Sequence, residues 1–293
     1  MATQLRGQLF APETVKDLFN KVQGHSSLAK LSQQIPVAFN GNDIFTFAMD
    51  NEVNLVAEDG VKAAGGITVD SVKVTPYKIE YGARVTDEFM YGAEEKQLDI
   101  LRGFNEGFAK KVARGLDIMA IHGLNPRTNT AATNTIGTKH FDSMVQNVVT
   151  YDATDPDGNI ESAIAMIADY ANVNGVAIDK TMAGALAALK VNGVKQYPQL
   201  AWGANPGQLN GCNLDVNSTV AVVATGGTAD KALVGDFEYF KWGFAKEIPL
   251  EVIEYGDPDQ SGSDLKAHNQ VYLRAEVYIG WAILDADAFA IVR

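Results

Sequence analysis

Cysteine, histidine and basic side chains are scarce in this chain of 293 residues. The single cysteine, Cys212, excludes an internal disulfide and fits a reducing compartment. The four histidines show no metal-ligand spacing, and we expect them at the surface or at helix ends. Lysine and arginine number 24 against 36 acidic residues, and the formal charge of −12 argues against a basic nucleic-acid-binding face.

Long apolar runs are also missing. No stretch approaches the length of a membrane span, and the first ten residues lack the apolar core of a signal peptide. The content of 46% hydrophobic and 20% charged residues is typical of a globular protein, and the length suffices for a sizeable core. We therefore expect a soluble protein of the cytosol, or one assembled there.

The most regular pattern in the chain is an amphipathic segment at residues 93–122. Its apolar residues recur at steps of three and four, which predicts one helix of roughly 45 Å. They are Leu98, Leu101, Phe104, Phe108, Val112, Leu116 and Met119. Gly103, Gly107 and Gly115 each cost a helix about 1 kcal/mol against alanine, so we expect another backbone to approach closely and offset this cost.

Alternating residues predict two long hairpins, one on each side of this helix in the sequence. The first joins strands at 44–49 and 72–85 through a tip rich in glycine and charge, and it should dock on something because isolated hairpins are marginal. The second joins 240–253 to 271–283 through an acidic turn. Between them lies an expected α/β or α+β lobe. Its helices are expected at 157–172 and 180–191, and its strands at 175–178, 219–224 and 232–237.

The first 38 residues are expected to form an arm with one short helix, between Pro12 and Gly24, followed by an apolar patch at Leu28, Leu31 and Ile35. This segment has too little apolar surface to fold alone. It should lie on another subunit or on the body of its own chain.

The order of these parts resembles the major capsid proteins of tailed bacteriophages, the Hong Kong 97-type fold. Short strings agree with the family pattern along nearly the whole chain. They are VAE at 56–58, VKVTPYKI at 72–79, VTDEF at 85–89, LNGCNL at 209–214, VGDF at 234–237, Arg274, and Ala288 with Phe289. In LNGCNL, Asn213 stands where the family usually has proline.

The resemblance implies an α+β fold with a long spine helix, an extended β-hairpin loop and an α/β axial lobe. The implied segments are an N-terminal arm at 1–38, an extended loop at 39–76, a peripheral domain with the spine helix at 77–122, an axial domain at 123–240, and the return hairpin with the final strand at 241–293.

The resemblance also implies a structural function without an enzymatic activity or a cofactor. Copies of the chain would form hexamers and pentamers of an icosahedral phage or prophage head around double-stranded DNA, assembled in the host cytoplasm and located in the virion. The implied partners are other copies, a portal, a decoration protein, and DNA contacted non-specifically, with no membrane. Because Met1 lies close to the arm, we expect a separate scaffolding protein.

Some relatives join subunits by a Lys–Asn isopeptide bond assisted by a buried glutamate, and the matching residues here are Lys62, Asn269 and Glu276. The interpretation we favour is ordinary: Lys62 is a solvated charge, Asn269 a turn residue, and Glu276 an ion-pair partner of Arg274 or Lys246. Other candidates are weak. Asp155 should cap a helix, since Ile164 stands where a calcium loop needs glutamate.

Three acidic residues of the far turn, Asp257, Asp259 and Asp264, are expected in solvent, and the alternative is a cation held where three subunits meet. Two other functions stay open. One is an encapsulin-type shell around a cargo enzyme, which shares the fold. The other is a soluble hydrolase, for which the sequence shows no reactive group.

Overall fold

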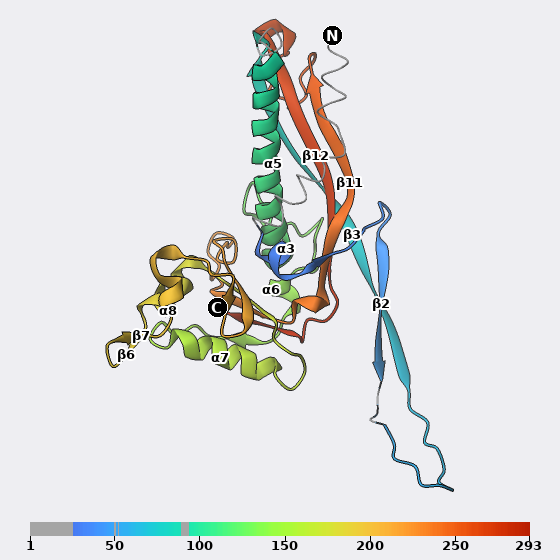
Figure 1. The fold of residues 1–293 in the computed structure, drawn as a ribbon. Coiled ribbons are helices and arrows are strands. Elements are labelled where there is room, and N and C mark those ends of the chain that lie inside the picture. Colours follow the sequence, from blue (N-terminus) through green and yellow to red (C-terminus); the bar gives the residue numbers. More distant parts are fainter. Residues whose placement is uncertain (1–25, 50, 52, 89–93) are drawn as a thin grey trace.

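The computed structural model describes residues 26–49, 51, 53–88 and 94–293. Figure 1 shows three parts: a tall unit in which one long helix lies along a sheet, a rounded lobe at its lower end, and a thin hairpin that projects away from both. The expected helix of the arm lies outside the described residues.

The long helix α5 runs from Glu94 to His122, which confirms the helix predicted from the apolar stripe. Leu101, Phe108, Val112, Leu116 and Met119 of that stripe are all buried. They pack in one cluster with the sheet of the tall unit and with residues of the lobe. The amphipathic pattern thus directs one side of α5 into the main core.

The glycines of α5 do not behave as expected. A Cβ added at Gly103 or Gly107 would meet no described atom within 4 Å, and at Gly115 the nearest is Pro126 Cγ at 3.5 Å. Within the described part of the chain, no backbone approaches these glycines closely. The expectation of a compensating close contact is therefore wrong for this part of the subunit.

A five-stranded sheet forms the other half of the tall unit, in the order β1-β11-β12-β3-β2. Its strands are β1 (Gln33–Gln34), β2 (Asn42–Met49), β3 (Ile67–Thr86), β11 (Phe240–Ile253) and β12 (Gln270–Ile283). Strands β2 and β3 pair as one antiparallel hairpin, and β11 and β12 pair as the other, so both predicted hairpins are confirmed. The second half of β3 pairs with β12, which fixes the root of the projecting hairpin to the body.

The lobe is built on a six-stranded sheet in the order β4-β13-β10-β5-β9-β8. Its strands are β4 (Val148–Val149), β5 (Gly175–Ile178), β8 (Gln208–Leu209), β9 (Cys212–Val216), β10 (Ala232–Gly235) and β13 (Phe289–Val292). Its helices are α6 (Phe141–Met144), α7 (Pro156–Ile167) and α8 (Lys180–Ala188), and Asp155 caps α7 as expected. Buried side chains of α7, α8 and the sheet share a second apolar cluster. The chain is therefore a mixed α+β protein.

Several expectations for the lobe are wrong. Helix α7 ends at Ile167 instead of continuing to residue 172, and the strand expected at 232–237 ends at Gly235. The strand predicted at 219–224 is a series of turns, because Thr219 leaves the sheet to bond Asp117 and His122 at the end of α5. Helix α8 ends at Ala188 instead of continuing to residue 191. Asn192 and Gly193 both have positive φ and form the tight turn between the short strands β6 (Lys190–Val191) and β7 (Val194–Lys195).

Candidate assembly surfaces

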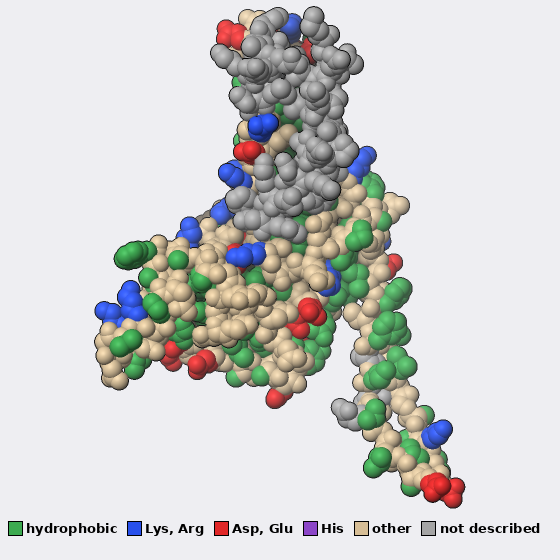
Figure 2. Space-filling model, in the orientation of Figure 1, with side chains coloured by type: hydrophobic (Ala, Val, Ile, Leu, Met, Phe, Trp, Pro, Cys, Tyr) green, Lys and Arg blue, Asp and Glu red, His purple; other side chains and the backbone are tan. Residues whose placement is uncertain are grey.

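One face of the projecting hairpin is apolar and uncovered. Phe47 lies directly opposite Val69 across the β2–β3 ladder, and Met49 lies opposite Ile67, so the four side chains share one face. Phe47 is 71% exposed and Met49 is 79% exposed. Figure 2 shows hydrophobic side chains along the length of this hairpin. We call these four residues the hairpin face.

The exposed apolar surface continues into the hairpin tip, where Val53, Leu55 and Val61 are each more than 90% exposed. Burying a side chain of this size stabilises a complex by about 1.5–3 kcal/mol. Contiguous apolar surface on a projecting element typically marks a site of protein–protein contact. The hairpin face and tip are thus a candidate protein–protein contact surface among the described residues.

The root of the hairpin is firmly held. Val74 of β3 is fully buried and packs with Val37 and Ala282 in a small apolar cluster. Because the root is packed and the outer half is exposed, the hairpin projects from a fixed base.

The base of the arm is anchored to the body of its own chain. Helix α3 (Ser27–Leu31) begins at Ser26, whose hydroxyl donates to the carboxylate of Asp117 in α5. The backbone N–H groups of Ser27 and Leu28 donate to the same carboxylate at 2.9 and 3.2 Å. Burial raises the pKa of Asp117, and these donors oppose the rise. We expected the arm to lie either on another subunit or on the body of its own chain. The part of the arm that the structure describes here, residues 26–31, is held by its own chain.

The acidic turn between β11 and β12 is fastened by one arginine. Arg84 of β3 donates to Asp259 at 2.9 Å and to Asp257 at 2.7 Å. Its guanidinium lowers the pKa of Asp259. Asp264 accepts from three backbone N–H groups of the turn. These carboxylates are therefore engaged within the chain, while Asp259 and Asp264 remain exposed to solvent as expected.

The three candidate cross-linking residues do not meet within one chain. Lys62 is exposed in the hairpin tip, whereas Asn269 ends the 3-10 helix η3 (Lys266–His268) directly before β12. The hairpin tip and the start of β12 lie at opposite ends of the molecule (Figure 1). Glu276 is 9% exposed, and its carboxylate lies 2.9 Å from Lys78 Nζ and 3.7 Å from Arg274 Nε. Any bond between Lys62 and Asn269 would have to join different subunits.

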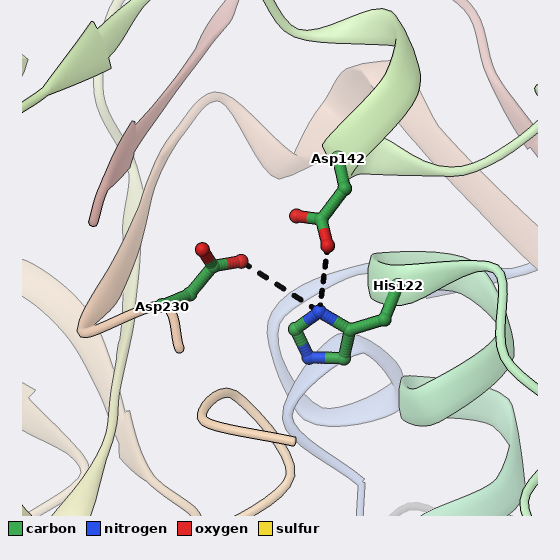
Figure 3. Close-up of side chains that lie close together, drawn as sticks. All are labelled: His122, Asp142 and Asp230. Atoms are coloured by element: carbon green, nitrogen blue, oxygen red, sulfur yellow. Dashed lines mark hydrogen bonds and ion pairs between the residues drawn. The ribbon is translucent and has the colours of Figure 1, made fainter. Parts of the chain in front are cut away.

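A buried cluster at the end of α5 was not foreseen. His122 is the last residue of α5, as expected for a helix-end histidine, but it is buried against Asp142 and Asp230 (Figure 3). Both carboxylates also bond Arg293 at 2.6 Å. Burial lowers the pKa of His122, but Asp142 and Asp230 outweigh it and raise the pKa above its usual value; burial raises the pKa of Asp230 to about 7. The partners lie far apart in the sequence, so no local spacing could have shown this group.

The fold and these surfaces describe a mixed α+β chain with an uncovered apolar hairpin on a packed root. No helix among the described residues is long and apolar enough to span a membrane.

The chain belongs to the phage capsid family, whose model matches residues 7–293. No curated protein matches the chain. A solved structure from Mycobacterium phage Ogopogo is similar at 32% identity and a TM-score of 0.78, and the match covers 92% of each chain. The resemblance to capsid proteins of phages is thus confirmed, and the protein has a structural capsid role.

More distant structures share the fold. One from Gordonia phage Cozz is 24% identical with a TM-score of 0.75, covering 92% of this chain and 86% of the other. The capsid of a native GTA particle is 13% identical with a TM-score of 0.61, covering 91% of this chain and 89% of the other. The same architecture therefore persists where little sequence identity remains.

Proposed function

We propose that this chain is a major capsid protein of the Hong Kong 97 type, whose copies form the hexamers and pentamers of an icosahedral head around double-stranded DNA. The observation that carries the proposal is the uncovered hairpin face on a firmly held root. A monomer gains nothing from projecting Phe47 and Met49 into water, whereas a shell buries one such hairpin per subunit against a neighbour. Many moderate contacts of this kind hold a closed shell by avidity.

The segments divide this work among them. The arm at 1–38 and the extended loop at 39–76 make contacts with neighbouring subunits. The peripheral domain at 77–122, together with the return hairpin at 241–293, forms the rigid part of the shell wall. The axial domain at 123–240 contacts the axial domains of other subunits around the symmetry axes. The formal charge of −12 suits an inner wall that contacts packaged DNA only non-specifically. A separate scaffolding protein, a portal and a decoration protein complete the head, which assembles in the host cytoplasm.

Electron microscopy of the purified full-length chain tests this proposal. We expect closed shells or flat hexameric sheets, and particles from infected or induced cells should contain DNA. Mass spectrometry of the same particles separates the two shell functions. A co-purifying cargo enzyme inside nucleic-acid-free shells would support the encapsulin-type alternative, and a stable monomer at every concentration would contradict both.

A matched pair of variants tests whether the hairpin face carries the assembly. Met49 on β2 and Met166 on α7 are both exposed, at 79% and 51%, so the same substitution to serine removes a similar apolar side chain in each. Met49→Ser should reduce particle yield at least tenfold at a fixed subunit concentration, because the lost burial recurs in every subunit. Met166→Ser should leave the yield within twofold of wild type. Equal yields for the two variants would place the assembly contact elsewhere.

A further inference from the structure

Three side chains from separate segments converge beneath the lower end of α5. His122 ends this helix, Asp142 lies in the first turn of α6, and Asp230 precedes β10. His122 Nδ1 is 2.9 Å from Asp142 Oδ2 and 3.7 Å from Asp230 Oδ2, and the three candidate ligand atoms all lie within 4.8 Å of one another. Figure 3 shows both carboxylates directed at the same ring nitrogen.

Neighbouring groups fix the direction of each of these atoms. His122 Nε2 lies 3.0 Å from the carbonyl oxygen of Thr219, so this nitrogen carries the proton and neutral histidine presents the Nδ1 lone pair to the carboxylates. Arg293 donates to Oδ1 of Asp142 and to Oδ1 of Asp230, each at 2.6 Å, which leaves Oδ2 of both facing His122. Metal-binding histidines and carboxylates are typically oriented by such outer contacts.

One carboxylate oxygen of the cluster lacks a hydrogen bond. Asp230 Oδ2 is buried and has no hydrogen bond to any described residue; His122 Nδ1, at 3.7 Å, lies within ion-pair distance but beyond hydrogen-bond distance, and the Asp230 side chain is 3% exposed. A buried carboxylate oxygen without a hydrogen bond is costly, so this atom favours a closer positive ligand than the His122 ring alone. Tetrahedral coordination by nitrogen and oxygen at zinc distances places ligand atoms about 3.3 Å apart, between the two separations from His122 Nδ1.

The surroundings favour a cation and let it enter. The C-terminal end of α5 contributes partial negative charge beside His122. The partial negative charge of the helix end and the charges of the two carboxylates offset the positive charge of Arg293. The Asp142 side chain remains 21% exposed, which gives a route from solvent.

We propose that His122 Nδ1, Asp142 Oδ2 and Asp230 Oδ2 bind one divalent transition-metal ion of the zinc class, with water as the fourth ligand. In the metal-free chain a proton on Nδ1 takes the place of the ion. The bound ion joins the end of α5 to α6 and to the segment before β10, and so fixes the lobe to the long helix.

Zinc binding to the full-length chain, stripped with chelator and dialysed, tests this site. Isothermal titration should give one Zn²⁺ per chain, confirmed by elemental analysis after dialysis. Asp230→Asn should weaken zinc binding at least tenfold, because it removes the negative charge of the carboxylate whose Oδ2 is the proposed ligand. Asp169→Asn, at an exposed acidic residue of the same lobe, should bind like wild type.

Cobalt provides a readout on the wild-type chain that does not depend on how a variant folds. We expect Co²⁺ to give the intense visible bands of a four-coordinate site, and Zn²⁺ to abolish them in equimolar amount. A wild-type chain that binds no Zn²⁺, or a Co²⁺ spectrum like that of the aqueous ion, would overturn the proposal and leave a purely ionic cluster of protonated His122 with its two carboxylates. Equal affinities of the Asp230→Asn and Asp169→Asn variants would also overturn it.

Discussion

Replacing Asp117 tests how the base of the arm is held. This carboxylate is fully buried in α5 and accepts hydrogen bonds from Ser26, Ser27, Leu28 and Thr219. Two of the donors are backbone N–H groups of the first turn of α3. In Asp117→Ala both would be left buried without this acceptor, and α3 should separate from α5.

The size of the effect follows from two opposing contributions. Hydrogen bonds to a charged group contribute about 1.5–3 kcal/mol each, but burying the carboxylate costs several kcal/mol. Asp117→Ala leaves neutral buried donors without their acceptor, at about 1–3 kcal/mol each, and removes the cost of burying the carboxylate, so we expect a net loss of roughly 3 kcal/mol. Asp117→Asn keeps the shape and one acceptor oxygen, but turns an NH₂ group toward the Ser27 N–H. It should cost about half as much.

Hydrogen exchange measured by mass spectrometry on the unassembled chain is the direct assay. The amides of Ser27 and Leu28 should exchange about a hundredfold faster in Asp117→Ala, the factor that corresponds to roughly 3 kcal/mol. Asp169→Ala, at an exposed acidic residue, controls for loss of charge. Unchanged exchange at these two amides in Asp117→Ala would refute the anchoring role, whatever happens to global stability.

Three further outcomes are expected. A Cβ at Gly243 would lie 1.9 Å from the carbonyl oxygen of Ile35, so Gly243→Ala should displace the segment around Ile35 from β11 and expose it to limited proteolysis. Gly107→Ala, where a Cβ meets no described atom within 4 Å, should not. Because Arg84 lowers the pKa of Asp259, the stability that this pair gives the acidic turn is complete above pH about 4 and is lost as pH falls through the lower folded pKa. The protection of the turn amides, measured relative to the intrinsic exchange rate at each pH, should therefore fall in acid for wild type, and already at neutral pH for Arg84→Ala. On a denaturing gel, boiled particles should run as a single band near 31.5 kDa, because Glu276, the residue that would assist a cross-link, already pairs with Lys78. Ladders of bands that disappear in Lys62→Arg would show a cross-link instead.

The long elements could be predicted because their patterns are local. Helix α5 repeats its apolar residues every three or four positions, and β2, β3, β11 and β12 alternate, so neighbouring residues suffice to reveal each. The exposed hairpin could also be expected, since its apolar strands flank a tip rich in glycine and charge.

Distant contacts explain what the sequence did not reveal. Residues 219–224 have the composition of a strand, yet Thr219 bonds Asp117, which lies 102 positions earlier. His122 has a plausible local role as a helix end, and only the folded chain brings it to Asp142, Asp230 and Arg293. Such networks have no repeat or spacing that a linear pattern could show.

A cryo-electron microscopy reconstruction of the assembled wild-type particle tests the central claim most directly. The account predicts that the β2–β3 hairpin of each subunit lies across a neighbouring copy, with Phe47 and Met49 covered by that neighbour. A particle in which these two side chains remain in solvent, or in which the hairpin folds back on its own subunit, would contradict it.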